Sequence, residues 1–135
     1  MGKAKIANNP SFMVILDQIA ICTQTFFKNN QPKLITRGFT HCVLLKNTVD
    51  RKYLRRFRYL NLDFQSSQGS RTIFFLSIPK VLDFFREVCL LKGRLIFIEE
   101  DTVNSNANEQ NCYIREMIIF CLSHYFTCNI FEMYT

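Results

Sequence analysis

One stretch constrains the fold of this chain more than any other: an unbroken apolar run followed by a polar segment and then a helix-like pattern. The run includes residues 95–98 (LIFI). It is typical of a strand at the centre of a parallel sheet, because both faces of such a strand are covered. We therefore predict a buried strand at 94–98. From about Asn111 onward, apolar residues recur at helical spacing and predict a helix with one buried face. The residues on that face are Ile114, Met117, Ile118, Cys121, Leu122 and Tyr125.

The segment between this strand and this helix carries acidic residues. A loop from a strand into a helix is where α/β domains bind anions, since the helix N-terminus presents free N–H groups. Here the strand is followed by Glu99, Glu100 and Asp101, and the segment up to Asn111 contains neither Gly nor Arg. Carboxylates repel phosphate, and a backbone without Gly does not easily form a tight phosphate cradle. The position favours an anion site, but its residues argue against one.

Three further strands are predicted from short apolar or alternating runs, at 12–16, 39–45 and 59–64. Two further helices lie between them, so that the expected order of elements is β-α-β-β-α-β-α. This alternation predicts an α/β fold of three layers, with a mostly parallel central sheet flanked by helices.

The two further helices are placed by their capping residues. Asp17 is the predicted N-cap of the first helix, which ends near residues 29–30, because apolar residues between the two recur at helical spacing. Ser77 is the predicted N-cap of the second helix. Pro79 then falls in its first turn, where a missing N–H costs little, and Gly93 ends it.

Composition sets the class of protein. With 135 residues, 48% of them hydrophobic, the chain is expected to form one domain over 1–135. The net charge of +6 is moderate and does not by itself imply a nucleic-acid partner. The sequence has no secretory signal, no apolar run long enough to span a membrane and no C-x-x-C. We therefore expect a soluble intracellular protein, cytoplasmic or nuclear, whose six cysteines are reduced and mostly buried.

The order of elements, with YLNLDF before a polar loop and GRLIFIEED after the long helix, resembles the dual-specificity protein phosphatase family. Residues 34–45 (LITRGFTHCVLL) are similar to the family's second strand. Residues 77–88 are similar to the helix that carries an Asp-Phe-Ile pattern, here Asp-Phe-Phe at 83–85. The match covers most of the chain and implies the fold of cysteine-dependent phosphatases. Family members usually add one or two helices after the last one predicted here, so the resemblance also implies a chain trimmed at its C-terminal end.

The family's catalytic signature, His-Cys-x-x-Gly-x-Ser-Arg-Ser after the strand, is degenerate in this chain. Laid on the sequence without gaps, it places Ile98 at the His and Glu99 at the nucleophilic Cys. The remaining positions, for the signature's Gly, first Ser and phosphate-binding Arg and for the general-acid Asp, fall on Thr102, Asn104, Ser105 and Ser66. The late start of the helical pattern also predicts an insertion of about eight to ten residues within 101–111.

The resemblance therefore implies a pseudophosphatase. Active members of the family use a thiolate of low pKa as the nucleophile and an Arg to hold the transferring phosphoryl group. With both missing, we expect an inactive domain that acts as a protein-interaction, regulatory or scaffolding module and needs no cofactor. The expected partner is a protein, such as a phosphoprotein or a kinase-pathway component, and not a membrane or nucleic acid.

Two alternatives remain open from the residues alone. In the first, the acidic loop 99–101 works with a divalent metal in a hydrolase. In the second, the basic segment 51–58 binds nucleic acid or an acidic partner. The cations of that segment are Arg51, Lys52, Arg55, Arg56 and Arg58. A zinc site is also considered at Cys121, His124 and Cys128, but a core helix with buried thiols explains their spacing.

Overall fold

A computed structural model of the chain describes residues 11–44, 56–62, 70–101 and 105–134, except the side chains at 70, 73, 105–110 and 128–134. These residues form a five-stranded sheet in the order β1-β2-β5-β3-β4. The strands are β1 Phe12–Leu16, β2 Ile19–Thr23, β3 His41–Leu44, β4 Arg58–Asn61 and β5 Leu95–Glu99. β1 runs antiparallel to β2, and all the other pairs are parallel. The prediction of an α/β fold with a mostly parallel sheet is confirmed.

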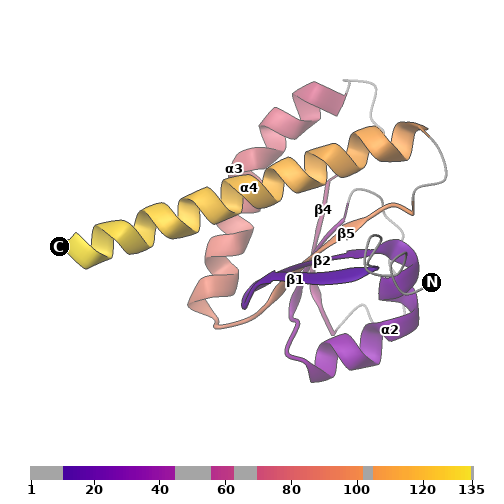
Figure 1. Ribbon diagram of the computed structural model, residues 1–135, viewed down its shortest axis with the longest axis horizontal. Helices are drawn as coiled ribbons and strands as arrows, with labels where there is room; N and C mark the ends of the chain where they lie inside the picture. Colours follow the sequence, from indigo (N-terminus) through magenta and orange to yellow (C-terminus); the bar gives the residue numbers. More distant parts are fainter. Residues whose placement is uncertain (1–10, 45–55, 63–69, 102–104, 135) are drawn as a thin grey trace, which may run out of the picture.

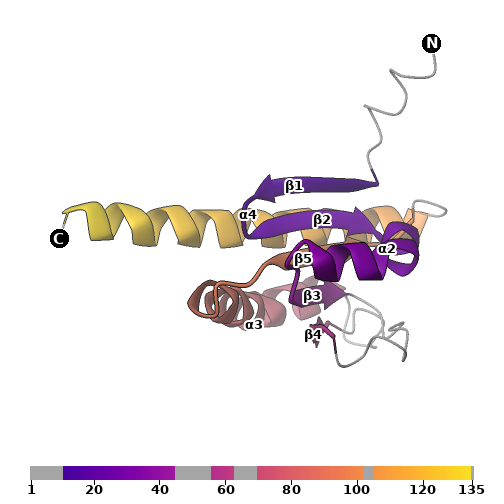
Figure 2. The same ribbon diagram turned by 90° about the horizontal axis from the view of Figure 1, so that it is seen from below.

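Helices cover both faces of the sheet (Figures 1 and 2). They are α2 Gln24–Thr36, α3 Ser70–Leu90 and α4 Ser105–Tyr134. α2 packs on one face, against a cluster that includes Cys42 and Ile96. α3 and α4 pack on the other face, against Val43 and Phe97. Because successive residues of a strand point to opposite faces, the unbroken apolar runs of β3 and β5 supply both layers of the core. No helix of the described residues is long and apolar enough to cross a membrane.

The first predicted helix begins later than expected and is preceded by a strand. Ile19–Thr23 is β2, a nearly wholly buried strand between β1 and β5. Asp17 lies in the turn between β1 and β2, and the N-cap of α2 is Thr23, whose hydroxyl accepts a hydrogen bond from the Phe26 N–H. α2 also continues beyond residues 29–30, through a kink at Asn30 and past Pro32.

The next two helices begin earlier than predicted. α3 starts at Ser70, so Ser77 is a buried residue inside the helix and Pro79 is not in its first turn. α4 starts at Ser105, so Asn111 lies within the helix. β3, β4 and β5 were placed within a few residues of their observed bounds, and β1 matches its predicted range.

The described cysteines are free thiols, as predicted. Cys22, Cys42 and Cys121 are buried, Cys89 is half-buried and Cys112 is exposed on α4. The expectation of burial is therefore correct for most of them and wrong for Cys112. Cys128 lies outside the described side chains.

Candidate functional site

The candidate site is the carboxyl end of β5, at the middle of the sheet. β5 lies between β2 and β3, and its last residue, Glu99, pairs in register with Thr23 at the end of β2. Both strands lead into helices here: β2 into α2, and β5 into α4 after a short connection. Ligands of open α/β sheets bind at the carboxyl ends of strands, near such helix starts. The carboxyl ends of β2 and β5 therefore have the geometry of a ligand site.

The side chain of Glu99 occupies this position. It is 14% exposed, and its Oε2 lies 3.7 Å from the Nε of Arg115 on α4. That oxygen is buried and accepts no hydrogen bond from the described residues. Burial raises the pKa of the Glu99 carboxyl, Arg115 opposes the rise, and the charge of Asp101 adds to it. The site is thus filled by a carboxyl group that its surroundings make costly to ionise.

Asp101 faces the start of α2. Its Oδ2 accepts a hydrogen bond of 2.6 Å from the Thr25 hydroxyl. The first turn of α2 contains no acidic residue of its own. Asp101 therefore supplies negative charge at a helix N-terminus, where the helix dipole favours it. Its contacts are those of a residue that stabilises the fold.

Asn111 joins α4 to the end of β5. Its side chain is almost fully buried and bonds to both main-chain groups of Glu100. The Glu100 N–H donates to Asn111 Oδ1 at 3.0 Å, and Asn111 Nδ2 donates to the Glu100 carbonyl at 3.0 Å. Sequence reasoning had not singled out Asn111, Arg115 or Thr25 as site residues. Asn111 could have been found, because it lies on the buried face of α4 that Ile114 continues.

The nearest described thiol, Cys22, lacks the character of a nucleophile. It lies on β2 and pairs in register with Ile98. Burial raises the pKa of Cys22 far above its ordinary value, and the charges of Glu99 and Asp101 add to the rise. Cysteine nucleophiles have a lowered pKa, produced by cations or a helix N-terminus. The surroundings of Cys22 keep it a protonated core residue.

The other predicted signature positions fall partly outside the described residues. Ile98 is buried among the residues on the α2 side of the sheet. Ser105 is the first residue of α4, and its side chain is not described. Ser66, Thr102 and Asn104 lie outside the described residues. The predicted insertion within 101–111 is wrong, because residues from Ser105 onward already belong to α4.

The acidic residues do not converge on a cation site. Glu99 pairs with Arg115 on α4, whereas Asp101 bonds to Thr25 on α2. No group of three His, Cys, Asp or Glu residues in the described part of the chain has the geometry to hold a metal ion. The zinc hypothesis also involves Cys128, whose side chain is not described.

The basic segment is only partly described, since residues 51–55 lie outside the described part. Arg56 is exposed, but Phe57 is buried between the rings of Phe27 and Tyr59. Arg58 forms an ion pair of 2.5 Å with Glu87, which also accepts from the buried His41. Phe57 is therefore a core residue and not a surface for stacking bases. The ion pair between Arg58 and Glu87 links β4 to α3.

Comparisons with known proteins identify the fold. No family model matches the chain, and no curated protein matches it. Among solved structures, it is similar to the crystal structure of a leucine rich repeat and phosphatase domain containing protein from Entamoeba histolytica. The two share 15% identity with a TM-score of 0.53, over 87% of this chain and 94% of that one. The chain thus has a phosphatase-like α/β fold.

Proposed function

We propose that this chain is a catalytically inactive, phosphatase-like domain that works as a protein-interaction, regulatory or scaffolding module. The proposal rests on one observation, the half-buried Glu99 carboxyl at the carboxyl end of β5. In the resemblance to dual-specificity phosphatases, this is the position of the nucleophilic cysteine.

The chemistry of Glu99 opposes phosphoryl transfer. A phosphate dianion that approached this strand end would meet the Glu99 carboxyl and the nearby charge of Asp101, and both repel it if ionised. The cation closest to Glu99 in the described structure, Arg115, already lies against it at 3.7 Å. Transfer to a cysteine would need a thiolate, and Cys22 is held in its protonated form.

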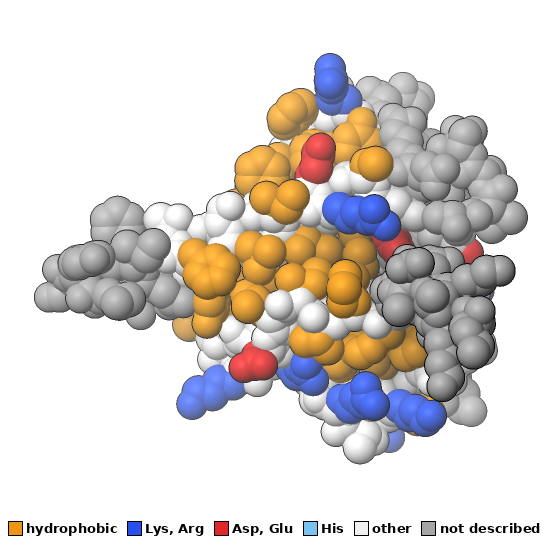
Figure 3. Space-filling view, viewed as in Figure 1, with side chains coloured by type: hydrophobic (Ala, Val, Ile, Leu, Met, Phe, Trp, Pro, Cys, Tyr) orange, Lys and Arg blue, Asp and Glu red, His pale blue; other side chains and the backbone are white. Residues whose placement is uncertain are grey.

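An exposed apolar surface on α3 and α4 supports the interaction role. Figure 3 shows hydrophobic side chains gathered over α4 and the adjoining part of α3. Large exposed residues on these helices include Phe75, Leu76, Ile119, Phe120 and Phe126. Contiguous apolar surface of this kind is typical of protein contacts.

The test is hydrolysis of a generic aryl phosphate by the purified domain, with and without divalent metal ions. We expect no turnover above that of buffer under either condition. The variant Glu99→Cys/Ser105→Arg, which restores two residues of the family signature, serves as the comparison. Turnover by the wild type that requires a metal and is lost in Glu99→Gln would contradict the proposal and favour a metal-assisted hydrolase. Metal-independent turnover would contradict it equally.

A further inference from the structure

β1 is an edge strand of the described part of the sheet. In the described residues, β1 hydrogen-bonds to β2 on one side and to no strand on the other. Its sequence, FMVIL, contains no charged residue and no proline. Charged residues and prolines are two of the devices with which proteins protect an edge strand from pairing, and a β-bulge, such as the register shift between Val14 and Leu16, is a third. Met13 and Val14 are about half exposed.

The register shows which main-chain groups face outward. The Thr23 N–H donates to the Ser11 carbonyl at 3.0 Å, so these residues form a hydrogen-bonded pair of the antiparallel ladder. Such pairs alternate with non-hydrogen-bonded ones, and Val14 pairs with Ala20 in the non-bonded class. The N–H and C=O of Val14 therefore point away from β2, toward the free edge.

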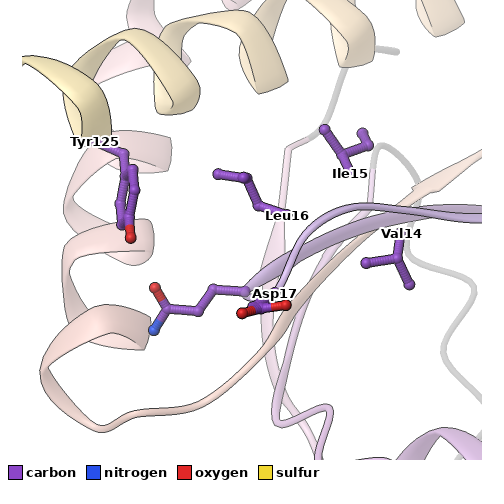
Figure 4. A pocket seen from close by; sticks show the side chains of 6 residues that line it. Val14, Ile15, Leu16, Asp17 and Tyr125 are labelled. Carbon is purple, nitrogen blue, oxygen red and sulfur yellow. The ribbon is translucent and has the colours of Figure 1, made fainter.

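A cavity lies beside the same edge (Figure 4). The register of β1 shifts between Val14 and Leu16, and both Ile15 and Leu16 pack toward the core that α3 and α4 form. The cavity has a volume of about 320 Å³ and is lined by residues 14–18 and Tyr125. Since Asp17 and Gln18 form the turn before β2, it lies at the opposite end of β2 from Glu99.

The walls of this cavity combine two kinds of chemistry. Val14, Ile15 and Leu16 provide an aliphatic surface, and Asp17, Gln18 and Tyr125 provide a carboxylate, an amide and a phenol ring. The Asp17 carboxylate makes no ion pair within the described residues, although its main-chain carbonyl accepts from Arg94 Nε at 2.6 Å. A Lys or Arg side chain matches this arrangement, because its apolar stem covers aliphatic surface while its cation meets a carboxylate and an aromatic ring.

We propose that the β1 edge and this cavity together bind an extended peptide segment of a partner protein. The segment adds a strand beside β1 and places one Lys or Arg side chain in the cavity against Asp17. Strand addition uses main-chain hydrogen bonds for affinity and side-chain pockets for specificity. A second copy of β1 is a poorer occupant, because FMVIL has no basic residue to fill the cavity. This inference builds on the proposed interaction role by naming its surface and partner chemistry.

The probe is a labelled heptapeptide of alternating valine and threonine with one central arginine, titrated against the chain by fluorescence anisotropy. A matched peptide carries glutamate in place of the arginine. We expect saturable 1:1 binding of the arginine peptide and none of the glutamate peptide. Asp17→Asn should weaken binding about fivefold, as loss of a partly exposed ion pair would. The matched control Asp83→Asn, which removes an exposed carboxylate on α3, should leave it unchanged.

Val14→Pro tests strand addition separately. It removes an outward N–H while leaving the β1–β2 hydrogen bonds in place, so it should abolish binding without unfolding the chain. Equal affinity of Asp17→Asn and wild type for the arginine peptide would overturn the proposal, even if Val14→Pro fails to fold. Self-association of the wild type in sedimentation that Val14→Pro prevents would overturn it in favour of a second copy. Neither result bears on the aryl phosphate assay, which probes the opposite end of β2.

Discussion

Replacing Asn111 should weaken the contact between α4 and the end of β5. The side chain is 4% exposed and makes two hydrogen bonds of 3.0 Å with the main chain of Glu100. Each such bond contributes about 1 kcal/mol net, and main-chain groups left unpaired add to the loss. Asn111→Ala should therefore lower the free energy of unfolding by about 2–3 kcal/mol.

Urea denaturation followed by far-UV circular dichroism measures this loss, since the chain has no Trp to report by fluorescence. Cys112→Ser, at the exposed neighbouring position, is the matched control and should change stability little. Asn111→Asp keeps the acceptor but loses the donor to the Glu100 carbonyl and adds charge near Glu99. It should be destabilised at neutral pH and recover partly in acid, when the new carboxyl is protonated. An Asn111→Ala loss below about 0.5 kcal/mol, at an unchanged denaturant slope, would refute the reasoning.

Three further predictions concern Glu99 at the carboxyl end of β5, Gly93 before the start of β5, and the thiols of Cys22 and Cys112. Burial raises the pKa of the Glu99 carboxyl in the folded state above its pKa in the unfolded chain. The free energy of unfolding should therefore fall as the pH rises from the unfolded-state pKa through the folded-state pKa. Glu99→Gln should therefore stabilise the fold at pH 7 by about 1 kcal/mol and not at pH 4, and an equal gain in melting temperature at both would contradict this. A Cβ at Gly93 would overlap the Thr40 hydroxyl, so Gly93→Ala should cost about 2 kcal/mol, partly recovered with Thr40→Ala. Strictly additive melting shifts would argue against that overlap. In native protein, iodoacetamide should label Cys112 and leave Cys22 unmodified by mass spectrometry, whereas fast labelling of Cys22 below pH 7 would reveal a reactive thiolate.

The central strand could be predicted from sequence because its apolar run is too short for a helix and bounded by Gly93 and acidic residues. Ile19–Thr23 is a strand, although its residues were predicted to belong to a helix. Periodicity cannot separate a buried strand from a helix in a short segment that is almost wholly apolar, such as IAICT, and the Asp17–Gln18 turn carries none of the usual hairpin signals. The neighbours β1 and β5, which only the tertiary structure supplies, decide the outcome.

The helix starts were harder to predict than the helices. Ser77 with Pro79 imitates a helix N-terminus, yet α3 starts at Ser70 and buries Ser77 among its neighbours. The first turns of α4 were not predicted either, because the residues before Asn111 are mostly polar and show no apolar periodicity. The acidic character of the site was readable from the sequence. That Glu99 contacts α4 whereas Asp101 contacts α2 could not be predicted, because these contacts depend on partners distant in the chain.

We propose that the carboxyl end of β5 does not bind a phosphoryl group. The most direct test is titration of the wild-type chain with inorganic phosphate and with tungstate, an oxyanion analogue, followed by amide NMR shifts. We predict no saturable shift at Glu100 or Asn111, whose main-chain and side-chain groups bond to each other at the end of β5. Saturable shifts at both residues, lost in Arg115→Gln, would contradict the claim and show a working oxyanion site.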